Sequence, residues 1–380
     1  MPDPLRLPAY QLITRPKAWQ NCLAQLKDQP IIGIDLEANS MYAYRERVCL
    51  AQISIPHQDF IVDPVALPNL DGLGEILANP QQEKIFHSAE YDLILLKREY
   101  DWEINNLFDT MWAARILGYP RVGLASLLEE IYHVTLNKRY QRANWCHRPL
   151  TEPQLVYAQA DTHFLIRLRQ HLAEQLAQNN QTAEATEIFI EHSRVHPNNN
   201  EFNPDSFWSI SGATRLPPSS QAVLKALHVY RNQEAQQRNQ PLFKILSDRT
   251  LLELARNLPH QQSDLRLIHG MSSGQIHRYG QTILRIIREN EKGPSPRRPR
   301  RQPRLPDDVV TRYEKLHNWR KERGIARGVE SDVIMSREAL WAFAHANPQT
   351  LAELEAVAAL GPWRLKTYGA DILQLLNEET

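Results

Sequence analysis

The C-terminal half of the chain repeats itself, and this repeat limits the possible folds more than any other feature does. A series of positions recurs 89 residues further along, and no gap is needed to align the two copies. Matching pairs include Leu227 and Leu316, His228 and His317, Arg231 and Arg320, Leu251 and Leu340, and Tyr279 and Tyr368. Tandem copies of one unit fold alike, so we expect two small all-α domains in succession.

Two polar segments mark the boundaries of these copies. One is the asparagine-rich stretch His196–Pro204, and the other is Gly293–Pro306, where five arginines alternate with prolines. The arginine–proline composition cannot bury an apolar core, so this segment should be an extended linker. We therefore predict a first domain over 1–197, a helical domain over 207–292, a linker over 293–306 and a second helical domain over 307–380.

The first domain alternates strand-like and helix-like segments. Short apolar and β-branched runs predict strands, whereas longer amphipathic runs predict helices. The predicted strands are Tyr10–Ile13, Ile31–Leu36, Val48–Ile55, Asp59–Val62 and Lys84–Phe86. The predicted helices are Pro16–Leu26 with Thr14 as its N-cap, Tyr91–Arg98, Asp109–Leu117, Leu124–Tyr132 and Glu152–Leu176. This order of elements predicts an α/β domain with a mixed sheet flanked by helices.

Two acidic residues, Asp35 and Glu37, stand at the end of the apolar run that begins at Ile31. Side chains alternate between the faces of a strand, so both carboxylates point to one side and Leu36 points to the other. The adjoining segment 28–44 contains no lysine or arginine that could offset their charge. Hard cations such as Mg²⁺ prefer oxygen ligands, so a metal ion would suit this pair. The alternative is a solvated acidic turn.

Two further acidic clusters follow. His87–Asp92 leads from a strand into a helix, and Tyr157 and Asp161 stand four residues apart on one face of a later helix. A Tyr–Asp pair at this spacing is common in helices without a catalytic role, so it gains weight only beside the other acids. Asp109 competes with Asp92 as the third acid, but its position before a helix suits an N-cap.

Together, one strand supplies Asp35 and Glu37, and two helices supply Asp92 and Asp161. Four carboxylates can hold two divalent cations, Mg²⁺ or Mn²⁺, roughly 4 Å apart. One ion would polarise an attacking water and the other would stabilise the leaving oxygen of a phosphodiester. The hydroxyl of Tyr157 could orient the water. The pattern therefore predicts metal-dependent hydrolysis of phosphodiesters.

This constellation resembles the DEDD superfamily of 3′–5′ exonucleases, and the tyrosine in the third motif is typical of the DEDDy subgroup. The stretch Trp-x-x-Arg-Pro-Leu-Thr over 145–151 resembles the ribonuclease D family, and this likeness covers nearly the whole chain. The two helical copies resemble helicase-and-RNase-D C-terminal (HRDC) domains, which bind nucleic acid. The resemblance implies a ribonuclease H-like fold and metal-dependent release of 5′-mononucleotides from the 3′ ends of RNA, such as tRNA precursors.

The resemblance also assigns roles to single residues. It implies that Asp35, Glu37, Asp92 and Asp161 are the metal ligands and that Tyr157 positions the water. Arg148 is a candidate contact for the RNA backbone, and its alternative role is an ion pair that holds the loop before the third motif. Many relatives have threonine and an aromatic residue where this chain has Leu36 and Ala38, so Met41, Tyr42 or Tyr44 could supply the stacking surface for the terminal base.

Charge is unevenly distributed along the chain, although the net charge is zero. Residues 1–200 carry 18 basic and 24 acidic side chains, whereas residues 201–380 carry 26 basic and 20 acidic ones. The first helical copy has 12 basic and 8 acidic residues over 201–293, so it and the linker should bind the RNA backbone. The expected linker contacts are Arg297, Arg298, Arg300 and Arg301. The second copy, with 9 basic and 12 acidic residues over 305–380, should pack against the nuclease or contact protein.

Composition limits where the protein works and what it binds. No apolar run approaches the roughly 20 residues of a membrane span, and residues 1–20 contain no apolar signal core, so a cytoplasmic location is expected. A monomer is also expected. The three cysteines, Cys22, Cys49 and Cys146, match no metal-binding pattern and are expected to form no disulfide. No phosphate-binding loop of the Gly-x-x-x-x-Gly-Lys-Ser/Thr type is present, so no nucleotide cofactor is expected.

Two other functions remain open at this stage. A DNA-directed proofreading exonuclease would use the same acids, because the chemistry occurs at the phosphate. A non-catalytic RNA-binding scaffold would use the helical copies alone, since such copies also occur in helicases. The complete set of four acids and a tyrosine favours an enzyme, and the stretch 145–151 favours RNA.

Overall fold

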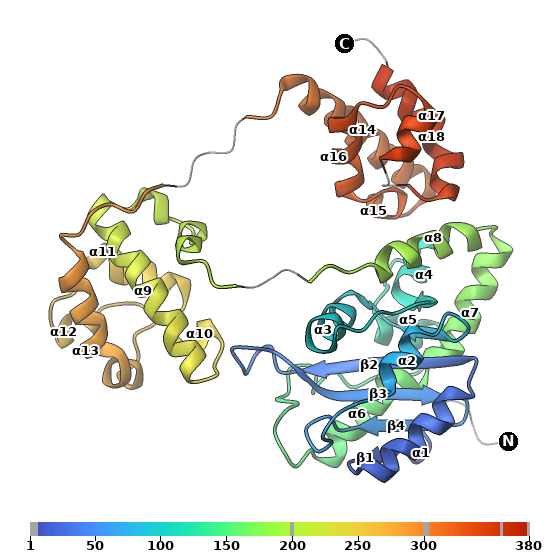
Figure 1. Cartoon of the computed structure of the whole chain (residues 1–380), viewed down its shortest axis with the longest axis horizontal. Coiled ribbons are helices and arrows are strands. Elements are labelled where there is room, and N and C mark those ends of the chain that lie inside the picture. The colour runs from blue at the N-terminus through green and yellow to red at the C-terminus, as the bar shows by residue number, and fades with distance from the viewer. Residues whose placement is uncertain (1–6, 198–200, 299–303, 358–359, 378–380) are drawn as a thin grey trace. The chain divides into compact units, whose positions relative to one another are not determined.

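The computed structural model (Figure 1) describes residues 7–197, 201–298, 304–357 and 360–377. By its internal contacts, the chain divides into two compact units. One unit combines Met1–Ala38, Val48–Pro197 and Pro303–Thr380, so it holds the first domain and the second helical copy. The other combines Asn39–Arg47 with Asn198–Gln302 and holds the first helical copy.

A mixed six-stranded sheet forms the centre of the first domain, in the order β1-β4-β3-β2-β5-β6. Its strands are β1 (Gln11–Ile13), β2 (Ile31–Ala38), β3 (Val48–Ile55), β4 (Gln58–Val62), β5 (Glu83–Phe86) and β6 (Leu107–Asp109). Strand β2 pairs antiparallel with β3 and parallel with β5. The end of β2 that carries Asp35 and Glu37 pairs with β3 alone, because the pairing with β5 covers only Ile31–Gly33.

Helices cover both faces of this sheet, as predicted. They are α1 (Pro16–Lys27), α2 (Leu73–Ala78), α3 (Glu90–Tyr100), α4 (Thr110–Ile116), α5 (Leu124–Tyr132), α6 (Glu152–His163), α7 (Leu165–Gln178) and α8 (Thr182–Ser193). Helices α1 to α3 pack with Ile32, Ile34 and Leu36 in one core. Helices α4, α5, α7 and α8 form a second core with Ile85 and Phe108. Figure 1 shows α1 and α2 across the near face of the strands.

The structure corrects several expectations about these elements. The single helix expected over Glu152–Leu176 is two helices, α6 and α7, with Phe164 between them. Strand β6 and helices α2 and α8 were not predicted. Thr14 is not an N-cap, because α1 begins at Pro16 and Arg15 takes the capping position without a side-chain hydrogen bond.

The two helical copies contain matching helices. The first copy has α9 (Pro218–Gln237), α10 (Leu242–Ile245), α11 (Asp248–Asn257), α12 (Gln262–Leu265) and α13 (Ser273–Asn290). The second has α14 (Asp307–Arg327), α15 (Ser331–Ile334), α16 (Arg337–Ala346), α17 (Leu351–Ala356) and α18 (Pro362–Asn377). Each helix of the second copy begins 89 residues after its counterpart, which confirms the duplication read from the sequence.

The second helical copy docks on the first domain through ion pairs. The guanidinium of Arg115 donates two hydrogen bonds to Asp332, and that of Arg327 donates two to Glu184, which is only 1% exposed. Val333 packs in the core of the first domain. The expectation that this copy packs against the nuclease is therefore confirmed. Among the described residues, no helix is long and apolar enough to cross a bilayer.

Candidate active site

Asp35 and Glu37 lie on the same face of β2 as Gly33, whereas Leu36 packs in the opposite core. Gly33 matters here because a Cβ at this position would lie only 3.2 Å from Leu165 Cβ. The missing side chain therefore lets the junction of α6 and α7 approach the strand closely. This approach brings Asp161, near the end of α6, to the two strand carboxylates.

Asp35, Glu37 and Asp161 form a compact acidic group. One carboxylate oxygen from each lies within 4.8 Å of the others, and all three side chains are partly buried. Asp92, in the first turn of α3, is buried beside this group and interacts with Asp35 and Asp161. The four acids predicted as metal ligands thus come from one strand and two helices that the fold brings together.

Burial, with a further contribution from neighbouring charges, raises the pKa values of these carboxylates. Burial raises the pKa of Asp35 to about 7. Burial and the nearby charges of Asp35, Asp161 and Asp92 raise the pKa of Glu37 to about 10. The pKa values of Asp92 and Asp161 also lie well above their usual range, chiefly because of burial. A divalent cation would remove this penalty, so an all-oxygen acidic site of this kind fits a hard metal ion.

Tyr157 stands one turn before Asp161 on α6 and donates a hydrogen bond from its hydroxyl to that carboxylate. Its ring packs against Trp145, with centroids 5.8 Å apart, and against Tyr140, with centroids 6.2 Å apart. Burial and the acidic neighbours raise the pKa of the phenol, so the hydroxyl keeps its proton. Tyr157 is therefore a fixed O–H group at the edge of the acidic group.

Comparison with known proteins places this arrangement in a family. The family described as 3′-5′ exonuclease matches residues 10–177, and the HRDC domain matches residues 220–287 and 311–376. Ribonuclease D from Pseudomonas paraeruginosa is 26% identical over 94% of this chain and 95% of its own length. The chain contains a 3′-5′ exonuclease domain followed by HRDC domains, and it is similar to ribonuclease D over nearly its whole length.

Two further relatives define the limits of this likeness. Exosome complex exonuclease RRP6 from Saccharomyces cerevisiae is 33% identical over 56% of this chain, which spans only 31% of that protein. The crystal structure of Escherichia coli RNase D, 23% identical, shares the fold with a TM-score of 0.67 over 98% of this chain and 99% of that chain. Metal dependence is a property of this exonuclease family, in agreement with the acidic group.

Asp109 is the N-cap of α4, which confirms the capping role weighed against a metal-binding one. Its carboxylate accepts hydrogen bonds from the backbone N–H groups of Met111 and Trp112. His87, the first residue of the second motif, lies 2.9 Å from Thr110 Oγ1 through its Nδ1. These contacts hold the end of β5 against the start of α4.

Arg148 takes the alternative role considered for it in this ribonuclease D-like chain. Its guanidinium donates to both carboxylate oxygens of Asp63, at 2.7 and 2.6 Å. The remaining N–H groups donate to the carbonyl oxygens of Trp145, His147 and Cys49. Because its N–H groups are engaged within the protein, the structure favours a loop brace over an RNA contact.

The other candidate RNA contacts have different surroundings. In the unit of the first helical copy, the Tyr44 hydroxyl donates to Asn232 Oδ1 at 2.7 Å and its backbone N–H donates to Asn239 Oδ1 at 3.2 Å. Arg297 and Arg298 are exposed. Arg300 and Arg301 lie outside the described residues.

A disulfide joins Cys49 on β3 to Cys146 in the loop before α6, so the expectation of three unpaired cysteines was wrong. Cys22 is the free cysteine of the described chain, and it is buried. The bond spans 97 positions of sequence, so only the fold brings its two ends together. The bond fixes the segment that carries Tyr140 and Trp145 to the sheet. Both of these side chains pack against Tyr157.

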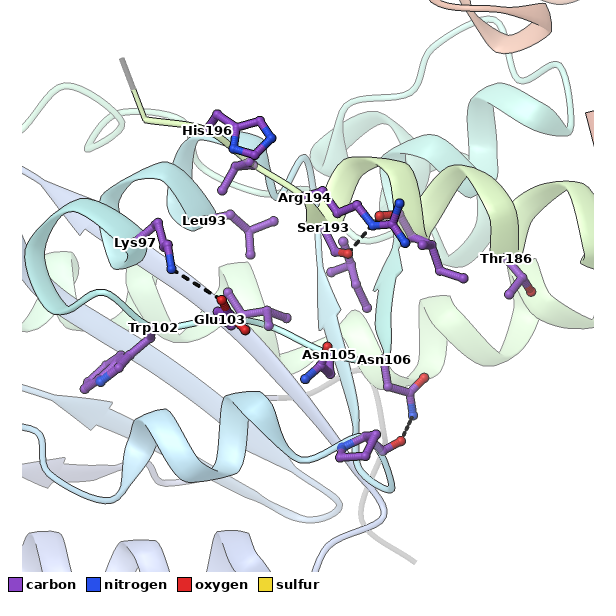
Figure 2. A pocket seen from close by; sticks show the side chains of 15 residues that line it. Leu93, Lys97, Trp102, Glu103, Asn105, Asn106, Thr186, Ser193, Arg194 and His196 are labelled. Atoms are coloured by element: carbon purple, nitrogen blue, oxygen red, sulfur yellow. Dashed lines mark hydrogen bonds and ion pairs between the residues drawn. The ribbon is translucent and has the colours of Figure 1, made fainter. Parts of the chain in front are cut away.

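A cavity of about 810 Å³ lies away from the acidic group, between α3 and the end of α8 (Figure 2). Lys97, Trp102, Arg194 and His196 line it, and Lys97 pairs there with Glu103 at 3.5 Å. None of the four predicted metal ligands or Tyr157 lines this cavity. The candidate active site is therefore the acidic group, and this cavity is not part of it.

Proposed function

We propose that this chain shortens RNA from its 3′ end by metal-dependent hydrolysis and releases 5′-mononucleotides. The proposal rests above all on one observation: oxygens of Asp35, Glu37 and Asp161 lie within 4.8 Å of one another, with Asp92 buried beside them. Two divalent cations, Mg²⁺ or Mn²⁺, would be held by these four acids and would supply an activated water and charge stabilisation at the leaving oxygen.

The residues of the chain would divide the remaining work. The hydroxyl of Tyr157 is held by Asp161 and would orient the attacking water toward the terminal phosphate. The packing of Trp145 on the Tyr157 ring fixes the direction of that hydroxyl. A positioned O–H group of this kind contributes through orientation, since the raised pKa of the phenol keeps the proton on its oxygen.

The substrate proposed is RNA with a free 3′ end, with tRNA precursors as the first candidates. The basic first helical copy and the linker arginines Arg297, Arg298, Arg300 and Arg301 would contact its backbone. The matches at residues 10–177, 220–287 and 311–376 fall within the domains proposed here, 1–197, 207–292 and 307–380, which supports these boundaries. A cytoplasmic monomer stays a prediction, and light scattering would test its oligomeric state.

The test is a cleavage assay on a 3′-extended tRNA precursor and on single-stranded RNA and DNA of one sequence. With Mg²⁺ or Mn²⁺, we expect stepwise shortening of RNA from the 3′ end, and no shortening in EDTA. Tyr157→Phe keeps the ring packing and removes the hydroxyl, so it should lower turnover about 10²-fold while metal binding persists. Internal cuts, faster cleavage of DNA, or full activity of Asp35→Ala would contradict the proposal.

A further inference from the structure

Asp109, at the end of β6, is a buried carboxylate that no part of the proposed chemistry uses. It is 1% exposed, and it accepts four backbone hydrogen bonds. Its Oδ1 accepts from the N–H groups of Ser88, Met111 and Trp112 at 3.0, 2.9 and 3.2 Å, and its Oδ2 accepts from Ala89 at 2.7 Å. One side chain therefore binds the N-terminal ends of two helices.

The second of these helices is α4, for which Asp109 is an ordinary N-cap. The first is α3, whose own N-cap residue, Ala89, has no side chain that could accept a hydrogen bond. Asp109 instead accepts hydrogen bonds from the N–H groups of Ala89 and Ser88 at the start of α3, from a strand 20 residues away in sequence. It also fixes the turn at Ser88, whose φ of 64° is a conformation that few residues other than glycine adopt readily.

Asp92 lies in the first turn of α3, two residues after the helix begins at Glu90. The position of its carboxylate is therefore set by the direction in which α3 leaves the turn that Asp109 holds. Asp109 is also close enough for its charge to raise the pKa of Asp92. Its own charge is stabilised by the four N–H groups and by the positive ends of two helix dipoles.

We propose that Asp109 is a positioning residue for the metal site: it orients Asp92 toward Asp35 and Asp161 by capping α3 and α4 together. The inference rests on the proposed function only in taking these acids as metal ligands. Partners that orient a metal ligand commonly change metal affinity or activity about 10–100-fold when they are replaced. The same size of effect is expected here, without a loss of RNA affinity.

The test uses two variants of the full-length chain. Asp109→Asn keeps the shape but replaces one acceptor oxygen with an NH₂ group, so a donor then faces the N–H groups. Asp109→Ser keeps a good cap for α4 and is too short to reach α3. Titration of Mn²⁺ followed by electron paramagnetic resonance gives metal affinity directly, and an RNA assay at several Mn²⁺ concentrations gives kcat and KM.

Two control variants separate positioning from general damage. Asp101→Asn changes the C-terminal end of the same helix, where an exposed side chain pairs with Lys97 and asparagine tolerates the left-handed backbone. Leu23→Ala removes core packing in α1, away from the acidic group, and should lower the melting temperature by several degrees. Neither control should change the Mn²⁺ affinity.

We expect both Asp109 variants to raise the dissociation constant for Mn²⁺ about 10–100-fold and to lower kcat, with KM for RNA changed less than about 2-fold. The inference would be overturned if the Asp109 variants bound Mn²⁺ as tightly as the unmodified chain. It would also be overturned if Leu23→Ala, destabilised to the same extent, lost as much Mn²⁺ affinity as they do. If the unmodified chain binds Mn²⁺ but leaves RNA intact, the proposed function fails and the positioning claim is still decided by the metal titration.

Discussion

Glu187 on α8 caps helix α18 of the second helical copy, and Gly361 makes the contact possible. The carboxylate of Glu187 accepts a hydrogen bond from the backbone N–H of Trp363 at 2.7 Å, and a Cβ added to Gly361 would overlap that carboxylate. The first copy has Ser272 at the equivalent position, and Ser272 caps its own helix through the N–H of Gln275. The two copies therefore differ at this position: the serine of the first copy caps its own helix, whereas the glycine of the second leaves room for Glu187 of the nuclease domain to cap it.

This difference predicts that Gly361→Ser weakens the docking of the second copy on the nuclease, while the ion pairs of Arg115 and Arg327 remain. The serine supplies the cap that the first copy uses, so the helix itself should stay folded. Loss of the Glu187 contact should cost about 1–3 kcal/mol, the usual effect of removing hydrogen bonds to a buried charged group. Limited proteolysis of the linker over 293–306 and thermal unfolding would measure it.

A double-mutant cycle with Glu187→Gln provides the control for that prediction. If the two residues act through one contact, the double variant should be hardly less stable than either single variant. Additive effects would show that Gly361 and Glu187 stabilise the chain independently. Ser272→Ala, at the equivalent position of the first copy, should weaken only the first copy.

The acidic group predicts an unusual dependence of stability on pH. Burial raises the pKa of Asp35 from 3.8 to about 7 in the folded chain, so the folded state binds more protons than the unfolded state between these values. Without metal ions, the contribution of this group to stability is therefore greatest below about pH 4 and is lost as the pH rises through 7. Thermal unfolding in EDTA at pH 5.5 and 8 would reveal the change.

Asp35→Asn is the matched variant for this effect. It removes the ionisation, so it should raise the melting temperature in EDTA at pH 8 by roughly 3–8 °C while abolishing RNA cleavage. Saturating Mn²⁺ should stabilise the unmodified chain and leave the variant almost unchanged. A variant less stable than the unmodified chain in EDTA would contradict the cost of burying the ionised Asp35 carboxylate.

Local patterns in the sequence were sufficient to predict part of this site. The alternation of strand side chains predicts that Asp35 and Glu37 share a face. The position of Asp109 directly before a predicted helix predicts that it is an N-cap. The apolar pattern of α6 continues into α7, so periodicity alone hides the break at Phe164. Strand β6 was missed because Leu107–Asp109 contains no β-branched residue and its last residue begins the helix predicted over Asp109–Leu117.

Contacts between distant segments were beyond those local patterns. Cys49 and Cys146 are 97 positions apart, and nothing in the sequence near either residue indicates that β3 lies beside the loop before α6. The same holds for Asp63 and Arg148, 85 positions apart. A zero net charge likewise hides the ion pairs that dock the second helical copy, since these pairs depend on tertiary structure.

The disulfide predicts a response to reducing agents. Closing a long loop stabilises a folded domain by about 2–4 kcal/mol, chiefly by restricting the unfolded chain. Reduction should therefore lower the melting temperature, and it should also lower turnover modestly because Trp145, beside Cys146, packs on Tyr157. The double variant Cys49→Ser, Cys146→Ser should have the melting temperature of the reduced chain, and dithiothreitol should not change it. Equal melting temperatures with and without the reductant would contradict this prediction.

The ion pair between Arg148 and Asp63 allows a test that separates its two possible roles. The Asp63 carboxylate is 7% exposed and the Arg148 side chain 25% exposed, so loss of either partner leaves a poorly solvated charge. If Arg148 braces the loop, Arg148→Ala and Asp63→Ala should each destabilise the chain by about 1.5–3 kcal/mol, and the double variant should be no worse. RNA affinity and its salt dependence should stay unchanged in the folded protein.

An RNA-binding role predicts the opposite outcome for Asp63→Ala. Removing the carboxylate would free the guanidinium, so RNA affinity would rise and would fall more steeply with salt, whereas Arg148→Ala would weaken binding. Filter binding of a single-stranded RNA at 50 and 200 mM salt, in EDTA to prevent cleavage, distinguishes the cases. Because the guanidinium already donates to Asp63, Trp145, His147 and Cys49, we expect the two alanine variants to behave alike.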